Sequence, residues 1–220
     1  MQGYDVVIYG DSISENWRGT SGGLPYIRKD NTSSRPDPNF VAADMRAAFL
    51  ETLGQRLLNG QTPKVDPKVA VVLIGTNDLY AATQCAAQDE DQLKSAVKTI
   101  VTGFQQLLAA MRQGMPSTHI VVQALYPRGE DMEDNMFELT RSDPFMHYIS
   151  CGEEFVTPTS DAIVKEYLPD GLHPNAEGLR LIAECLTPLL QKLTSSNATT
   201  NAIQPAQNRV DLEASASELW

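Results

Sequence analysis

The sequence has no long hydrophobic run and few basic residues. Its longest apolar stretch, Val69 to Ile74, has the length of a strand and falls far short of the roughly 18–20 residues that a membrane-spanning helix needs. Lys and Arg number 17 against 28 Asp and Glu, which gives a net charge of -11. Because so acidic a chain repels phosphate backbones, we expect no nucleic acid as a partner.

Cysteine is also scarce. Cys85, Cys151 and Cys185 are widely spaced, and no C-x-x-C pair is present. An odd and scattered set argues against a disulfide framework or a zinc knuckle and favours a reducing compartment. The first apolar run begins already at Val6, so no signal peptide precedes it. We therefore expect a cytoplasmic protein, with a trimmed longer precursor as the alternative.

The apolar residues that are present suffice for a core. Hydrophobic residues make up 42% of the chain and charged residues 20%, which excludes global disorder and predicts a soluble acidic protein. A length of 220 residues predicts one domain, which we place at residues 1–193. Residues 194–220 are rich in Ser, Asn, Thr, Ala and Gln, a composition typical of a disordered polar tail.

Strand and helix patterns alternate along the chain. Short apolar runs predict parallel strands at residues 4–10, 69–75, 119–125 and 146–151. Helical spacing of apolar residues predicts helices at residues 38–60, 93–114 and 175–193, and residues 19–39 are interpreted as a loop. Strands that alternate with helices predict an α/β fold, a three-layer α/β/α sandwich around a parallel sheet.

Polar residues collect where the strands of such a sheet end, which is where ligands bind. Gly10-Asp11-Ser12 follows the first strand, Gly75-Thr76-Asn77-Asp78 follows the second, and Asp170-Gly171-Leu172-His173-Pro174 leads into the last helix. These segments supply a nucleophile, an oxyanion donor, an orienting carboxylate and a general base. In that order, the candidate site residues are Ser12, Asn77, Asp170 and His173.

Each segment alone also has a simpler interpretation as a turn or a helix cap. His119 and His147 are interpreted as ordinary strand residues. Asp170 and His173 could also be metal ligands, but a metal site would need a third ligand nearby, and the sequence offers none. The joint occurrence of all the segments, each at a strand end or a helix start, favours a catalytic site.

The three segments resemble the first, third and fifth sequence blocks of the SGNH (GDSL-like) hydrolases, over roughly residues 4–193. Within that superfamily they are most similar to the catalytic subunits of platelet-activating-factor acetylhydrolase. The further segments that carry this resemblance are Ser12-Ile13-Ser14-Glu15-Asn16-Trp17, Leu58-Asn59-Gly60, Leu125-Tyr126-Pro127-Arg128-Gly129 and His173-Pro174-Asn175-Ala176-Glu177-Gly178.

The resemblance implies a flavodoxin-like fold and a role for each candidate residue. Ser12 resembles the nucleophile, His173 its general base and Asp170 the carboxylate that orients the histidine. The three-residue spacing suits a tight loop that folds Asp170 back onto Nδ1 of His173 and leaves Nε2 facing Ser12. Asn77 resembles an oxyanion-hole donor, joined by the backbone N–H of Ser12.

One departure from the family pattern is expected to matter. Members of the family carry a second strand that ends in a glycine whose N–H also binds the oxyanion, and this strand is expected to be missing here, through evolved loss or a lost exon. Gly54 is a candidate replacement for that glycine. The family strand order is 2-1-3-4-5, so the first strand should become a sheet edge.

The expected activity is that of a serine esterase that hydrolyses small acyl esters, in particular acetyl esters, through an acyl-serine intermediate. No cofactor or metal is expected, because the histidine transfers the protons. The lost glycine donor should impair the activity. The alternative is a catalytically weak or inactive relative that acts as a binding or assembly subunit. The resemblance also implies a homodimer.

Overall fold

A parallel sheet forms the centre of the fold. The computed structural model describes residues 5–18, 20, 21, 24, 25, 41–44, 67–86, 90–127, 140, 143–157 and 162–195. Within these residues the sheet has the strand order β4-β1-β5-β6-β7, and all the pairs are parallel. Its strands are β1 (Val6–Gly10), β4 (Val41–Asp44), β5 (Val69–Leu73), β6 (His119–Gln123) and β7 (Met146–Ile149).

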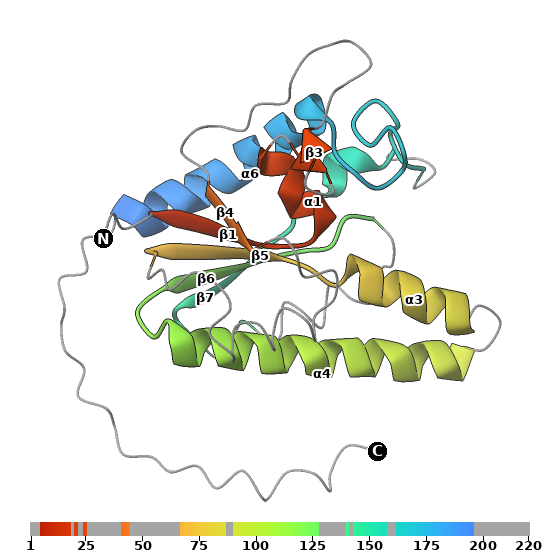
Figure 1. The fold of residues 1–220 in the computed structure, drawn as a ribbon, viewed down its shortest axis with the longest axis horizontal. Helices are drawn as coiled ribbons and strands as arrows, with labels where there is room; N and C mark the ends of the chain where they lie inside the picture. The colour runs from red at the N-terminus through yellow and green to blue at the C-terminus, as the bar shows by residue number, and fades with distance from the viewer. Residues whose placement is uncertain are drawn as a thin grey trace, which may run out of the picture.

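Helices cover both faces of this sheet (Figure 1). On one face lie α3 (Thr76–Ala86) and α4 (Glu90–Gly114), and on the other lie α1 (Ser12–Glu15) and α6 (Ala176–Ser195). Two short 3-10 helices, η1 (Asn16–Arg18) and η2 (Glu153–Phe155), complete the helical elements described. The prediction of an α/β fold with a parallel sheet and flanking helices is therefore confirmed.

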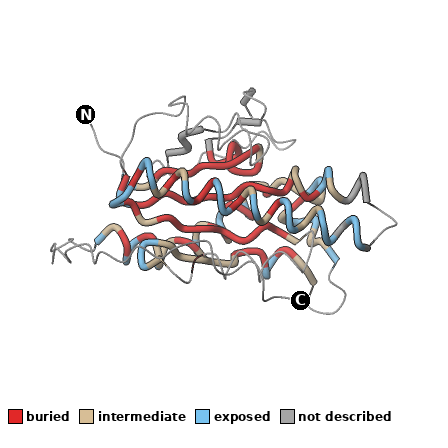
Figure 2. Tube along the Cα trace, turned by 90° about the horizontal axis from the view of Figure 1, so that it is seen from below, coloured by how far each residue is buried: buried red, intermediate tan, exposed pale blue. Residues whose placement is uncertain are grey.

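The core lies between the sheet and the helices. Every residue of β5 is buried, as expected for a central strand without polar alternation. Figure 2 shows the buried strands in the middle and exposed stretches along the covering helices. The apolar stripe of α4 and that of α6 close the two layers through the buried residues Ile100, Phe104, Leu107, Leu108, Met111, Leu179, Ile182, Leu186, Leu190 and Leu193.

The predictions of a missing second strand and of an edge position for the first strand are both wrong. The strand β1 is not at the edge, because Val41–Asp44 pairs with it in parallel, with Val7 opposite Val41 and Ile8 opposite Ala42. The helix predicted here rested on the four-residue spacing of apolar residues that begins at Val41. At an open edge, the backbone N–H and C=O groups along one side of β1 would have no partners in the sheet. Pairing with β4 supplies hydrogen bonds to these groups. Gly54 and the rest of the expected helix lie outside the described residues.

Smaller differences concern the first loop and the end of the domain. The segment interpreted as a loop contains β2 (Thr20–Ser21) and β3 (Leu24–Pro25), which pair antiparallel. Thr194 and Ser195, which were assigned to the tail, are the last residues of α6. The remainder of the expected tail lies outside the described residues.

A disulfide bond joins Cys151, just after β7, to Cys185 in α6, so the expectation against disulfides is wrong for this pair. The fold places their Cα atoms 5.8 Å apart, within the range that a disulfide spans. A separation of 34 residues along the chain gave no sign of that proximity. The closed loop contains both Asp170 and His173.

Candidate active site

The segment Gly10-Asp11-Ser12 forms a sharp turn between β1 and α1. A Cβ atom on Gly10 would lie 2.1 Å from Oγ of Ser14 and 2.2 Å from the carbonyl oxygen of Leu73, so only glycine fits. Asp11 is the N-cap of α1, and its Oδ1 accepts a hydrogen bond of 2.9 Å from the N–H of Ile13. The turn thus places Ser12 as the first residue of α1, at the carboxyl end of β1.

The segment from Asp170 to Pro174 forms a second turn. Gly171 adopts φ of 83°, a left-handed conformation that favours glycine. This lets the carboxylate of Asp170 fold back, so that Oδ1 accepts hydrogen bonds from the N–H groups of Leu172 (2.9 Å) and His173 (2.7 Å). Oδ2 of Asp170 lies 2.7 Å from Nδ1 of His173.

The two turns meet at Ser12. Its Oγ lies 2.9 Å from Nε2 of His173, although the two residues are 161 positions apart in the sequence. The structure therefore brings Ser12, His173 and Asp170 into one continuous chain of hydrogen bonds. Both ring nitrogens of the histidine are engaged, and the side chain is 25% exposed.

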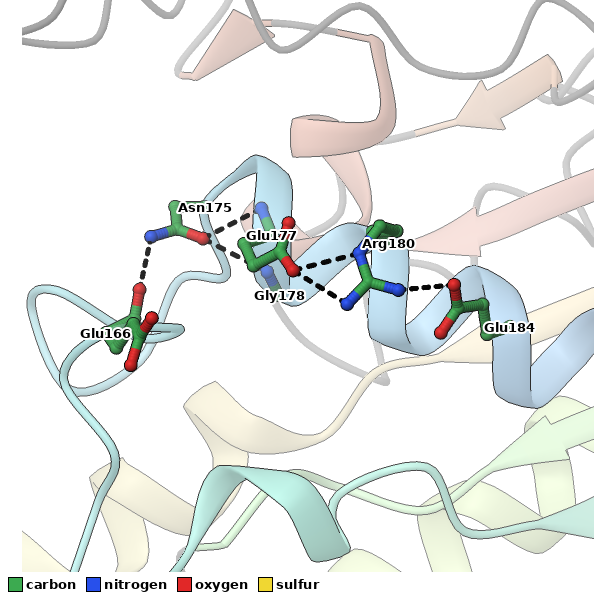
Figure 3. A network of polar contacts seen from close by, with 6 residues as sticks. All are labelled: Glu166, Asn175, Glu177, Gly178, Arg180 and Glu184. Atoms are coloured by element: carbon green, nitrogen blue, oxygen red, sulfur yellow. Dashed lines mark hydrogen bonds and ion pairs between the residues drawn. The ribbon is translucent and has the colours of Figure 1, made fainter.

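Asn175 fixes the histidine turn to the start of α6 (Figure 3). Its Oδ1 accepts hydrogen bonds of 3.0 Å from the N–H groups of Glu177 and Gly178, and its Nδ2 donates to the carbonyl oxygen of Glu166 at 2.6 Å. Arg180 continues the network along the helix through ion pairs with Glu177 and Glu184. The turn is thus held from the side of α6.

Asn77, the fourth predicted residue, is half-buried in the first turn of α3, which follows β5 directly. Because Gly10 and Leu73 are opposite each other in the β1–β5 pair, the first turn of α3 begins at the same end of the sheet as Ser12. The structure thus brings Ser12, Asp170 and His173 into contact and places Asn77 at the same edge of the sheet.

The two acids of the site differ in their electrostatics. Burial is the main cause that raises the pKa of Asp11 to about 6, against the lowering effects of the Ile13 N–H and of His173. Burial would also raise the pKa of Asp170, but the hydrogen bonds from His173 and Leu172 outweigh it and hold that pKa below its ordinary value. Asp170 is therefore ionised at neutral pH beside the imidazole.

The sequence pattern gives no sign of the role of two buried polar residues in this region. Asp11 is 1% exposed, and its Oδ2 has no hydrogen-bond partner among the residues described. Asn16 is 2% exposed, and its Nδ2 donates a hydrogen bond of 3.3 Å to the carbonyl oxygen of Pro174. Neither a buried acid nor a contact between the two ends of the chain leaves a periodic signal in the sequence.

The described residues offer neither a cluster of metal ligands nor a membrane-spanning helix. Within the described ranges, no three or more His, Cys, Asp or Glu side chains are grouped so that they could hold a metal ion. His119 and His147 lie on neighbouring strands, and their ring nitrogens are 3.0 Å apart. Of the helices in the described part of the chain, none has the length and apolar character needed to cross a membrane.

A hydrogen-bonded serine, histidine and carboxylate at the carboxyl edge of a parallel sheet is the arrangement of side chains found in serine hydrolases. Comparison with known families is more specific, because residues 8–181 match the GDSL-like lipase/acylhydrolase family. The chain belongs to this family. The resemblance to SGNH hydrolases is thereby confirmed.

Individual relatives are distant. A platelet-activating factor acetylhydrolase IB subunit beta homolog of Drosophila melanogaster is 21% identical over 212 residues, covering 92% of this chain and 84% of the relative. A GDSL-like lipase from Bacteroides thetaiotaomicron has a TM-score of 0.54 at 17% identity, covering 85% of this chain and 87% of its own. A crystallised acetyl esterase mutant with acetate ion has a TM-score of 0.53 at 17% identity, covering 86% and 97%. The two solved structures support the fold.

Proposed function

We propose that this protein is a serine esterase that hydrolyses small carboxylic esters, with Ser12 as its nucleophile. One observation carries the proposal: Oγ of Ser12 lies 2.9 Å from Nε2 of His173, whose Nδ1 lies 2.7 Å from Asp170. Membership of a lipase/acylhydrolase family supports the same class of reaction. A turn that places one serine beside an oriented imidazole provides the geometry for proton removal.

The reaction proceeds in two halves. Nε2 of His173 takes the proton of Ser12 while Oγ attacks the ester carbonyl carbon, and the same proton then goes to the departing alcohol as the C–O bond breaks. Water attacks the acyl-serine with His173 as base, and the acid leaves as Ser12 regains its proton. Asp170 holds the ring by its Nδ1–H and stabilises the imidazolium that forms in each half.

The developing oxyanion needs hydrogen-bond donors, and we assign these to the N–H of Ser12 and the side chain of Asn77. No glycine follows Asp44 at the end of β4, where Met45 and Arg46 come next. If the family's glycine donor is lost, the turnover number falls by roughly a hundredfold to a thousandfold. The strand itself is not lost, because β4 occupies the edge of the sheet beside β1.

Acetyl esters are the proposed substrates. This preference is supported by the names of two similar proteins, the platelet-activating factor acetylhydrolase IB subunit beta homolog of Drosophila melanogaster and the acetyl esterase. Neither resemblance exceeds 21% identity, so the preference is a proposal for measurement. A series of p-nitrophenyl esters from acetate to octanoate should give its highest kcat/KM with acetate; a maximum at longer chains would refute the acyl preference while leaving the esterase assignment intact.

The decisive test is the pre-steady-state release of p-nitrophenol from p-nitrophenyl acetate. A burst with an amplitude near one per active chain is expected, together with labelling by a fluorophosphonate probe. Ser12→Ala should abolish both and keep the fold, because a half-buried serine contributes little packing. Labelling of Ser12→Ala at the rate of the native chain would refute the assignment of the nucleophile.

A catalytically weak relative that serves as a binding subunit is the second candidate. The lack of a glycine directly after Asp44 at the end of β4 favours this second candidate. Loss of a hydrogen-bond donor to the oxyanion would weaken catalysis without preventing folding. The absence of both burst and labelling in a folded native chain would establish this candidate over the esterase.

A further inference from the structure

Asn16 connects the two turns that form the site. It caps the C-terminal end of α1, and its Nδ2 donates a hydrogen bond of 3.3 Å to the carbonyl oxygen of Pro174. Pro174 directly follows His173, and Asn16 follows Ser12 by four residues, about one helical turn. The Asn16–Pro174 bond therefore lies beside the bond from Ser12 to His173 and joins the same two segments.

The carbonyl oxygen of Pro174 needs such a donor. Pro174 is buried and precedes α6, so its carbonyl oxygen takes no part in the regular hydrogen bonding of the helix. On its other side, the histidine turn is fixed to α6 by Asn175, whose backbone N–H also donates to Tyr167. Asn16 supplies the connection on the side of the nucleophile.

Stability alone does not explain a buried amide at this position. Asn16 is 2% exposed, and its Oδ1 has no hydrogen-bond partner among the described residues. A buried polar atom without a partner destabilises the fold, so half of this side chain acts against stability. The half that forms a bond reaches the residue next to the general base.

We propose that Asn16 is a positioning residue that sets the distance between Ser12 and His173. The inference rests on the proposed esterase function and adds a residue to it. Proton transfer depends steeply on that distance, and a displacement of about 1 Å costs roughly a hundredfold in rate. Asn16 touches no substrate and acts only through the turn that carries His173.

The test compares Asn16→Asp and Asn16→Ala with Thr118→Val. The aspartate has nearly the same shape as asparagine but cannot donate when ionised, and the alanine lacks the whole group. Thr118 is a matched control, because it is fully buried and donates to the carbonyl oxygen of Pro67 at 2.7 Å, where β5 and β6 begin. All the variants are compared at equal folded fraction.

In both Asn16 variants we expect kcat and the rate of fluorophosphonate labelling to fall about tenfold to a hundredfold. KM should change less than about threefold, because the substrate contacts are retained. Thr118→Val should lose thermal stability with an unchanged kcat. Native kcat in both Asn16 variants at equal folded fraction, or an equal loss of kcat in Thr118→Val, would overturn the inference.

A spectroscopic measurement separates this inference from the proposed function. The ¹⁵N chemical shift of Nε2 of His173, assigned with His173→Ala, reports its hydrogen bond to Ser12 without any turnover. It should move in Asn16→Asp and stay constant in Thr118→Val. If the native chain shows no burst, the esterase proposal fails, and an unmoved Nε2 signal in Asn16→Asp refutes the positioning role independently.

Discussion

Asp11 gives a prediction whose magnitude follows from its environment. Its carboxyl group is 1% exposed and accepts one hydrogen bond from the N–H of Ile13, while Oδ2 has no partner among the described residues. Burial raises the pKa of Asp11 from 3.8 to about 6. The folded state therefore prefers the neutral acid, and the unfolded chain ionises at lower pH.

The sign of the effect follows from proton linkage. The folded protein holds this proton more tightly than the unfolded chain, so its contribution to stability is complete below about pH 4 and is lost as the pH rises through about 6. The rise in the pKa of Asp11 from 3.8 to about 6 corresponds to about 3 kcal/mol of unfolding free energy. Asn at this position has the same shape, keeps an acceptor for Ile13 and cannot ionise.

The assay is urea unfolding of the native chain and of Asp11→Asn from pH 4 to pH 7.5. The difference in unfolding free energy between the two should change by about 2.5 kcal/mol across this range, in favour of the variant at higher pH, while the other titrating groups cancel. Ser14→Ala changes a buried group of the same helix without an ionisable side chain, and its difference from the native chain should be constant with pH. A constant difference for Asp11→Asn as well would refute the reasoning.

Three further predictions concern the turn at the nucleophile, the disulfide and the oxyanion. Gly10→Ala should destabilise the fold by about 2–3 kcal/mol in urea titrations, because its Cβ would lie 2.2 Å from the backbone oxygen of Leu73; an unchanged midpoint would contradict the tight fit. Replacing Cys151 and Cys185 together by serine should lower the free energy of unfolding by about 4 kcal/mol, because the disulfide restricts a loop of 34 residues in the unfolded chain. A loss below about 1 kcal/mol in the same titration would show that the disulfide is dispensable. Asn77→Ala should lower kcat by roughly a hundredfold to a thousandfold with little change in KM, and an unaltered kcat would exclude it as an oxyanion donor.

The sequence predicted the elements whose pattern permits a single interpretation. The apolar run at Val69 has the length of a strand and is rich in valine, and the stripe that ends at Gly114 is long and has helical spacing. Residues 41–44 are compatible with a helix and with a strand. They form a strand because they pair with the free side of β1, and this pairing exists only in the assembled sheet. The link from Cys151 to Cys185 depends likewise on how α6 packs.

Site residues that are close together in the sequence could be predicted from their residue types and spacing. Contacts that arise only from packing of distant segments could not. Asp170 and His173 are three residues apart, so a local turn suffices to join them. The contact between Asn16 and Pro174 spans 158 residues and exists only when both ends of the domain are in place. The burial that raises the pKa of Asp11 also arises from residues remote in the sequence.

The separation of Ser12 from His173 by 161 positions has a consequence for biosynthesis. A ribosome makes Ser12 just after the first strand and His173 only after all seven strands described here have been made. A nascent or prematurely terminated chain that ends before residue 170 therefore contains the serine without an activating imidazole. Parallel pairing of β1 with β5 also has to wait for residues about sixty positions later. Under the proposed function, hydrolytic activity therefore requires synthesis of both segments and their packing in the folded domain.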